Sequence, residues 1–339
     1  MNIVLCESAG RREFTAGNKA RTDTVNILLG HGYKHISLYT SKNKKPLVML
    51  QMICACIKTI LLAGKNDTVL VQYPYYPSIV NNILFNLLFA TRKLKHFRVV
   101  VLIHDSIGLR SNADVNIIRR ELALLDRMDV TICHNERMVE KFRESGGKGL
   151  YRVLGPFDYL YNGPLADKNT TYSNKTIVIA GNLSRQKSAY IYQLNDITDH
   201  CHYNLYGIGY DGKDTENVSY KGAFSPDELI SQLQGQYGLV WDGESCDTCS
   251  GAFGEYLKYN NPHKFSLYLA AGLPVIIWKS AALAVYVEKY GLGMCIDSLK
   301  ELDSRLSAIT SDDYLRMVEN VAKYRKSLVN GCHLKEALD

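Results

Sequence analysis

The sequence has little of what marks fibrous, disordered or disulfide-rich proteins. Only 8 prolines and 25 glycines occur in 339 residues, which excludes a collagen-like repeat. Charged residues make up 22 % of the chain and hydrophobic residues 46 %, values typical of a soluble globular protein rather than a disordered tail. No basic segment followed by a long apolar run is found near the first residue, so no secretory signal is predicted. The length corresponds to about two domains of ~150 residues each.

Cysteine and metal-ligand patterns are also sparse. The nine cysteines are odd in number and irregularly spaced, which predicts reduced thiols and a cytoplasmic protein. Cys246-x-x-Cys249 has the spacing of half a zinc site, but no matching second pair and no Asp-x-Asp triplet occur. We therefore expect no metal ion and no cofactor. The 40 Lys and Arg exceed the 34 Asp and Glu by 6, which suits an anionic ligand or surface and does not indicate nucleic-acid binding.

One apolar run raises the question of a membrane. Leu47–Gly64 is almost continuously apolar over 18 residues, but it contains Gln51 and Lys58 and is short for a membrane span of ~20 residues. We predict a buried helix that connects two strands. Insertion into a membrane surface is the alternative.

Short β-branched runs alternate with helical patterns through the first half of the chain. Strands separated by helices predict βαβ units and a parallel sheet. The predicted strands are Ile3–Cys6, Ile36–Tyr39, Thr68–Gln72, Val99–His104, Val130–Cys133 and Tyr151–Leu154. The predicted helices include Thr22–Gly30, Ile79–Ala90 and Asn116–Arg127.

A second alternating series follows a candidate linker at Gly155-Pro156 and Asp167–Lys175. Its predicted strands are Ile177–Ala180, Tyr203–Tyr206, Val218–Tyr220, Gly238–Trp241, Pro274–Trp278 and Met294–Ile296. Its predicted helices are Asp227–Leu233, Lys264–Ala271, Ala281–Tyr290 and Asp312–Leu328. We predict an acceptor-binding domain at residues 1–160, a nucleotide-sugar domain at 175–320 and a helical tail at 321–339 that packs back on the first domain.

The predicted class is α/β, with two Rossmann-like, doubly wound parallel sheets facing a cleft. This is the GT-B arrangement of glycosyltransferases, and periplasmic binding proteins and some epimerases share the pattern. The predicted lack of a signal peptide weighs against the binding proteins.

A cation in the first turn of a helix is the strongest chemical signal. After the strand that ends at Trp241-Asp242, a helix is predicted to begin near Asn261-Pro262, with Asn261 as N-cap and Pro262 in the first turn. Lys264 follows His263 in that turn, where a cation is unfavourable beside the helix dipole. A pyrophosphate bound to the helix N-terminus and to Lys264 explains it. An exposed lysine at a helix end is the alternative.

Two further strand ends offer an anion site and an aromatic surface. Ile179–Lys187 runs from a strand into a turn with Gly181, Asn182 and the cation Arg185, which suits an anion, although a plain βα turn is the alternative. Tyr206 ends the next strand beside glycines where a base or sugar can approach. We therefore predict donor contacts from Gly181, Asn182, Arg185, Tyr206, Asp242, Asn261, Pro262, His263 and Lys264.

The first half offers candidate acceptor contacts and a candidate base. The polar stretch Gly17–Asp23 is predicted as a loop that holds a polyhydroxyl acceptor, and aromatic residues after the third strand suit stacking on a sugar; solvated-loop and packing roles are the alternatives. Asp105 ends the fourth strand, where its carboxylate can take a proton from a hydroxyl, or cap the following turn. The predicted acceptor contacts are Gly17, Arg21, Tyr73 and His104.

These stretches resemble the bacterial β-1,6-galactofuranosyltransferases of O-antigen and capsule synthesis. The resemblance is carried by Trp241–Trp278 and Ile179–Tyr192, with weaker matches at Gly17–Asp23, Leu102–Asp105 and Cys133–Met138. A more distant similarity is to streptococcal glucosyltransferases that extend GlcNAc on serine-rich adhesins and share a lysine equivalent to Lys264.

The resemblance implies an inverting transfer from a UDP-sugar, with UDP contacts from Arg185, Tyr206 and Lys264. It implies UDP-galactofuranose as donor and a 6-hydroxyl of a glucoside as acceptor; residue chemistry alone does not separate a furanose from a pyranose. Asp105 is the candidate base, and Glu7 and Asp23 are alternatives. UDP-glucose-dependent transfer to GlcNAc-modified protein, epimerisation and non-catalytic binding are the competing functions.

We expect a lipid-linked acceptor at the inner face of the cytoplasmic membrane. The predicted helix Ile79–Ala90 is apolar and runs into Arg92, Lys93, Lys95 and His96, a pattern that favours peripheral contact with anionic lipid. A core helix with a solvated end fits the pattern equally well. A second copy of the chain, in a homo-oligomer, is a further expected partner.

Overall fold

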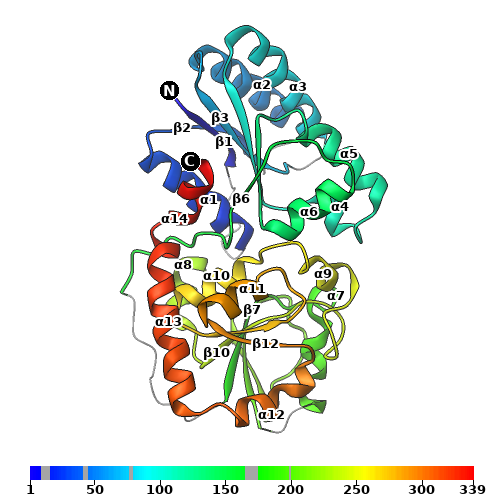
Figure 1. Ribbon diagram of the computed structural model, residues 1–339, viewed down its shortest axis with the longest axis vertical. Helices are drawn as coiled ribbons and strands as arrows, with labels where there is room; N and C mark the ends of the chain where they lie inside the picture. Colours follow the sequence, from blue (N-terminus) through cyan, green and yellow to red (C-terminus); the bar gives the residue numbers. More distant parts are fainter. Residues whose placement is uncertain (9–15, 41–44, 76–78, 165–174, 198–199) are drawn as a thin grey trace. The chain divides into compact units, whose positions relative to one another are not determined.

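Two units of the chain each contain one parallel β-sheet (Figure 1). The computed structural model spans residues 1–339 and describes all of them except 9–15, 41–44, 76–78, 165–174 and 198–199. Of the described residues, the first unit contains β1, residues 17–154 and Leu334–Asp339, and the second contains Gly155–His333. The predicted α/β class with two Rossmann-like parallel sheets is confirmed.

The sheet of the first unit has the strand order β2-β1-β3-β4-β5-β6, with all neighbours parallel. Its strands are β1 (Ile3–Ser8), β2 (Lys34–Thr40), β3 (Thr68–Tyr73), β4 (Arg98–Ile103), β5 (Val130–Cys133) and β6 (Tyr151–Val153). Its helices are α1 (Ala16–Gly30), α2 (Lys45–Leu62), α3 (Ile79–Lys95), α4 (Ile107–Arg110), α5 (Val115–Leu125) and α6 (Glu136–Glu144). The six predicted strands of this half are all present.

The winding of this sheet reverses between β1 and β3. The chain passes from β1 to β2 on one side and then returns to place β3 on the other side. Because crossovers between parallel strands are right-handed, α1 covers one face of the sheet and α2 and α3 cover the other. Ligands bind outside the carboxyl ends of the strands at such a reversal.

The sheet of the second unit has the order β12-β11-β10-β7-β8-β9, also parallel, with its reversal between β7 and β10. Its strands are β7 (Thr176–Asn182), β8 (His202–Ile208), β9 (Val218–Gly222), β10 (Tyr237–Val240), β11 (Val275–Trp278) and β12 (Gly293–Ile296). Its helices are α7 (Arg185–Ser188), η1 (Ala189–Asp196), α8 (Pro226–Gln232), α9 (Gly251–Tyr256), α10 (His263–Ala270), α11 (Ala284–Tyr290), η2 (Leu299–Glu301), α12 (Leu302–Ser307) and α13 (Ser311–Val329).

A buried tyrosine fixes α10 against the reversal point of the second sheet. Gly238 in β10 leaves room for the ring of Tyr268, since a Cβ on that glycine would lie 2.1 Å from it. The Tyr268 hydroxyl accepts a hydrogen bond from the N–H of Ala180 in β7, at 2.7 Å. Tyr268 thereby holds α10 against both β7 and β10.

The stretch predicted as a polar acceptor loop is helical instead. Gly17–Asp23 forms the first turns of α1, so the loop prediction is wrong. Lys19 and Asp23 lie one turn apart and form a largely buried ion pair at 2.9 Å, and Thr24 donates to the carbonyl oxygen of Ala20. These polar side chains satisfy one another along the helix, so they do not require a solvated loop.

The division between units falls at Leu154/Gly155 rather than at residue 160. The C-terminal part assigned to the first unit begins at Leu334 rather than at 321, because α13 packs on α10 of the second unit. The end of α14 (Cys332–Leu338) is held in the first unit by Arg152, whose guanidinium donates to the carbonyl oxygens of Ala337 and Leu338. Most of the predicted linker Asp167–Lys175 lies outside the described residues.

The apolar run Leu47–Gly64 forms the connecting helix α2, as predicted, but it is buried on one face only. Val48, Met52, Cys56 and Thr59 face the core. The opposite face is exposed, which corrects the prediction of a buried helix. In the parts of the chain that the structure describes, we find no helix long and apolar enough to cross a membrane.

Candidate functional site

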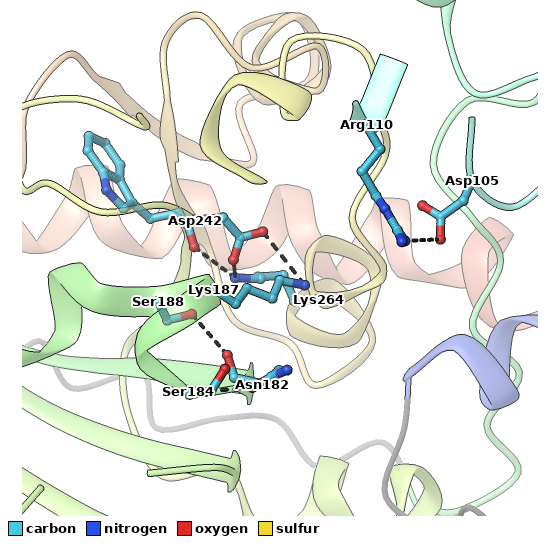
Figure 2. Close-up of polar contacts among 9 residues, drawn as sticks. Asp105, Arg110, Asn182, Ser184, Lys187, Ser188, Asp242 and Lys264 are labelled. Atoms are coloured by element: carbon cyan, nitrogen blue, oxygen red, sulfur yellow. Dashed lines mark hydrogen bonds and ion pairs between the residues drawn. The ribbon is translucent and has the colours of Figure 1, made fainter. Parts of the chain in front are cut away.

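Three segments of the second unit meet at the reversal of its sheet. β10 leads into Trp241 and Asp242, α7 carries Lys187, and α10 carries Lys264 in its first turn. The Lys264 ammonium donates to the carbonyl oxygen of Trp241 and to Oδ1 of Asp242, both at 2.8 Å. Lys187 Nζ lies 4.0 Å from Oδ2 of the same carboxylate. Figure 2 shows both lysines directed at Asp242.

The cluster of Lys187, Asp242 and Lys264 has more cationic than anionic groups. Two ammonium groups face one carboxylate, and the Lys264 and Asp242 side chains are largely removed from water. Burial lowers the pKa of Lys264, while the Asp242 carboxylate acts in the opposite direction. An ammonium has three donors, and the two contacts above leave capacity for one more acceptor. The cluster therefore favours an added anion.

The N-terminus of α10 supports the same conclusion. Its N-cap is Pro262, whose side chain has no group that can accept a hydrogen bond from the first turn, so the cap residue does not offset the positive end of the helix dipole. The prediction that Asn261 is the N-cap is wrong. Asn261 is buried, and its amide donates to the carbonyl oxygen of Gly155 at 2.6 Å, which holds the chain that precedes the helix.

A hollow that is open to solvent lies beside Lys264. Aromatic rings, glycines of two strand ends and the first turn of α10 form its wall. Its lining is Tyr159, Ala180, Gly181, Tyr206, Gly207, Ala223, Phe224, Pro226, Leu229, His263, Lys264 and Leu267. A mostly apolar wall with a cation at one side suits a flat heterocycle or sugar attached to a phosphate.

Backbone geometry at Gly207 keeps this hollow in shape. Its φ is +143°, and a Cβ there would lie 1.8 Å from the carbonyl oxygen of Gly181. Only glycine permits β7 and β8 to end this close together. The strand ends therefore present backbone, rather than side chains, to a ligand.

The structure brings some predicted donor residues together and not others. Gly181, Tyr206, His263 and Lys264 line the hollow, and Asp242 joins it through Lys264. Tyr206 is almost fully buried; its hydroxyl accepts from the N–H of Gln234, and burial raises its pKa.

Four other predicted donor residues are not part of that wall: Asn261 and Pro262, which precede α10, and Asn182 and Arg185. Asn182 is exposed and accepts from the N–H of Ser184 at 3.0 Å (Figure 2). Arg185 is also exposed; it pairs with Asp211 at 3.1 Å and stacks over the ring of Tyr192.

In the first unit, Asp105 follows β4 at the carboxyl edge of its sheet. Its side chain is 38 % exposed and pairs with Arg110 at 3.3 Å, as Figure 2 shows. The next residue, Ser106, caps α4. Its hydroxyl donates to the buried carboxylate of Glu121, which also accepts from the N–H groups of Ile107 and Gly108. Glu121 therefore fixes the turn that carries Asp105.

Three predicted acceptor residues of this unit form hydrogen bonds within the unit. Arg21 donates to the carbonyl oxygens of Gln72 and Pro74, and His104 Nε2 lies 2.6 Å from Oε1 of Gln72. Tyr73 is buried and hydrogen bonds to Glu121.

The carboxylates of Asp23 and Glu7 are the alternative candidates for the base. Asp23 is buried in its pair with Lys19. Gly17 lies in α1 and Glu7 in β1, but the side chain of Glu7 lies outside the described residues. Of the two candidate bases whose side chains the structure describes, Asp105 and Asp23, only Asp105 has a partly exposed carboxylate.

Glu121, Lys187 and Phe224 were not singled out as site residues from the sequence. Lys187 was visible in the cationic turn after β7, but its distance from Asp242 depends on the fold. Glu121 sits within an ordinary amphipathic pattern, and only its burial reveals it. In the described parts of the chain, no group of three or more His, Cys, Asp or Glu is placed to hold a metal ion.

Family models match both units. Residues 2–154 match the N-terminal domain, and residues 177–339 the C-terminal domain, of glucosyltransferase 3-like proteins. The chain is 33 % identical over 329 residues to the β-1,6-galactofuranosyltransferase WbbI of Escherichia coli K12, covering 96 % of this chain and 93 % of that protein. It is 23 % identical over 350 residues to glucosyltransferase 3 of Streptococcus parasanguinis, covering 100 % and 97 %.

A solved structure agrees on the architecture. Anabaena Alr3699/HepE in complex with UDP matches with a TM-score of 0.61 at 14 % identity, covering 100 % of this chain and 99 % of that one. At this identity the match informs the fold alone. The architecture of two parallel sheets is that of GT-B glycosyltransferases.

Proposed function

The chain belongs to the glucosyltransferase 3-like family and is a glycosyltransferase, and on this premise we propose that it transfers galactofuranose from UDP-galactofuranose to a 6-hydroxyl of a glucoside. The transfer is inverting and independent of metal. The acceptor oxygen forms a bond to the anomeric carbon, the bond from that carbon to UDP breaks, and the hydroxyl proton passes to a carboxylate. The acceptor is a lipid-linked glycan of surface polysaccharide synthesis.

The cluster of Lys187, Asp242 and Lys264 is the observation that carries the proposal. Its excess positive charge, beside the uncapped start of α10, suits the diphosphate and the charge that develops on it as UDP leaves. The adjoining hollow has the wall expected for a base or sugar. A related fold binds UDP in the Anabaena protein, which supports UDP as the carrier. Arg185 contributes a further diphosphate contact.

Asp105 is the proposed base. It is exposed at the carboxyl edge of the first sheet, and the Glu121 network fixes its backbone. A carboxylate held this way can accept the proton of an acceptor hydroxyl. Arg21, Tyr73 and His104 shape the acceptor side of this edge, through the chain segments that they hold.

Galactofuranose is proposed because WbbI, at 33 % identity, carries that activity in its name. Glucose is the second candidate, favoured by the family's name and by the streptococcal relative. In that case the acceptor is a GlcNAc-modified protein, and the cluster around Lys264 keeps its function.

UDP release in the presence of EDTA tests the proposal. UDP-galactofuranose, UDP-galactose and UDP-glucose are each supplied with an α-glucoside or a GlcNAc acceptor, and the anomeric configuration of the product is read by NMR. We expect acceptor-dependent release with UDP-galactofuranose and the glucoside, with inverted configuration. Release with UDP-glucose and GlcNAc instead replaces the donor assignment. Loss of activity in EDTA, restored by a divalent cation, contradicts metal independence.

A further inference from the structure

An apolar face of α2 points away from the core of the first unit. Leu50 is 58 % exposed and Leu61 73 % exposed. The exposed positions recur every three or four residues, so they form one continuous stripe along the helix. The stripe consists of Leu47, Leu50, Ile53, Cys54, Ile57 and Leu61, and we call it the α2 stripe.

The neighbouring helix on the same face of the sheet is built differently. α3 packs its apolar residues Leu84, Phe85, Leu88 and Phe89 into the core and exposes Asn82 and Asn86 among its outer residues. The basic apolar helix that the sequence analysis connected with lipid is therefore a core helix. Its neighbour α2 has the exposed apolar surface, which is unusual for a helix surrounded by water.

Basic residues accompany the α2 stripe. Lys58 is exposed among its leucines and isoleucines. Because α2 and α3 both cross from the carboxyl to the amino edge of a parallel sheet, they end at the same edge. There α3 contributes Lys93, Lys95 and Leu94, which is 82 % exposed. Residues 45–98 contain seven Lys and Arg and one acidic residue, Asp67, which is paired with the chain's N-terminus.

We propose that the α2 stripe docks on an anionic lipid bilayer, with α2 lying in the plane of the surface. Leucine and isoleucine side chains enter the boundary of the acyl chains, and the flanking lysines contact lipid phosphates. A second copy of the chain is a poorer occupant, because pairing two such faces brings like charges together. The docking does not depend on which sugar is transferred, so it goes beyond the proposed function.

Co-sedimentation with vesicles tests the docking. The full chain is mixed with vesicles of phosphatidylglycerol and phosphatidylethanolamine, or of phosphatidylcholine alone. We expect a bound fraction at least tenfold larger on the anionic vesicles, and a decrease when salt is raised to screen the lysines. Equal binding to both vesicle types, or to neither, overturns the proposal.

The double variant Leu50→Glu/Ile57→Glu isolates the α2 stripe. It places two carboxylates on the face without touching the core, and we expect it to lower vesicle binding at least tenfold. Leu29→Glu is the matched control, because Leu29 is 47 % exposed on α1 on the other face of the sheet, and it keeps wild-type binding. Wild-type binding by the double variant overturns the proposal.

Two further measurements separate docking from folding, self-association and catalysis. Circular dichroism of the double variant checks its fold, and Leu50→Ser/Ile57→Ser replaces it if it unfolds. Light scattering on a sizing column measures mass: a wild-type dimer that Leu50→Glu dissociates assigns the face to a second copy and overturns the proposal. UDP release with a water-soluble acceptor stays unchanged in the double variant, so a failed donor assignment is distinguishable from failed docking.

Discussion

The polar side chains at the carboxyl edges of the two sheets are arranged differently. In the second unit, Lys264 and Lys187 face a single carboxylate and leave positive charge in surplus. In the first unit, Arg21 donates to backbone carbonyl oxygens, and Glu121 accepts from two backbone N–H groups and from the Ser106 hydroxyl. These bonds fix the turn on which Asp105 is partly exposed. An edge with excess positive charge is suited to bind an anionic ligand. An edge whose side chains are hydrogen bonded to one another and to the backbone is suited to hold one side chain in place.

Asp105→Asn tests the exposed carboxylate most directly. If this side chain takes the acceptor proton, turnover falls by about 10²–10⁴-fold with little change in KM for the donor. Its pair with Arg110 is exposed, so the melting temperature changes little. Asp297→Asn, which removes a more exposed pair with Lys279, is the control and keeps turnover. Normal turnover in Asp105→Asn, with loss in Glu7→Gln or Asp23→Asn, moves the base to that residue.

Lys264→Met tests the surplus charge of the second unit. Losing this ammonium is expected to lower turnover by about 10²–10³-fold, the typical cost of one contact to a developing charge. It also leaves Asp242 buried, so stability falls, and the added substitution Asp242→Asn is expected to restore the melting temperature but not turnover.

Two lysines provide graded comparisons for that result. Lys187→Met, at the more distant and more exposed lysine, is expected to lower turnover about tenfold. Lys258→Met removes an exposed pair with Glu255 and a contact of the ammonium with the ring of Trp278, and serves as the control in the same UDP-release assay. Equal turnover in the Lys258 and Lys264 variants contradicts the donor site.

The buried histidine at the end of β5 predicts how stability depends on pH. Burial lowers the pKa of His134 to about 4 from its usual 6.5, against the opposing effect of its hydrogen bond with the carbonyl oxygen of Ile103. Between about pH 4 and pH 6.5, His134 is therefore protonated in the unfolded chain and neutral in the native chain. Its contribution to the free energy of unfolding is complete above pH 6.5 and falls by about 3 kcal/mol as the pH drops to 4.

His134→Gln removes this titration while an amide can still donate to Ile103. Urea denaturation of wild type and variant at pH 7 and pH 4.5 measures the difference. The variant is expected to lose less stability on acidification. Parallel losses in the two proteins show that other groups account for the acid sensitivity.

Glu121→Ala tests the braced turn, with the smallest expected effect. It leaves the buried donors of Ser106, Ile107 and Gly108 without their acceptor, and we expect a loss of about 1–3 kcal/mol in unfolding free energy. Denaturant midpoints measure the loss. If Glu121 positions Asp105, turnover falls as well, and Glu121→Gln recovers part of both quantities. An unchanged midpoint contradicts the bracing role.

The strands were open to prediction because burial on both faces leaves continuous β-branched runs, such as Val99–Ile103, whereas their order in each sheet was not predicted. Helix starts were less accessible. The polar stretch Gly17–Asp23 was predicted as a loop because the ion pair between Lys19 and Asp23 forms only when the segment is helical. Asn261 read as an N-cap by type, yet a contact with Gly155, 106 positions away in sequence, determines its role.

The candidate site was likewise only partly predictable from the sequence. Lys264 was found from the sequence because a cation in the first turn of a helix conflicts with the dipole and so signals an unstated partner. Its pairing with Asp242 and the approach of Lys187 depend on how β7, β10 and α10 converge. No local feature of the sequence indicated the role of Glu121, since its partners include the backbone N–H groups of Ile107 and Gly108 and the hydroxyl of Ser106, which only the fold brings to it.

Cys54 gives the α2 stripe a further use. Of the nine thiols it alone is exposed, while the others are buried or half-buried. A maleimide fluorophore should therefore attach at one position without any engineered cysteine. Its emission wavelength would report the polarity around α2 directly, so the protein carries its own attachment point for a spectroscopic sensor of that surface.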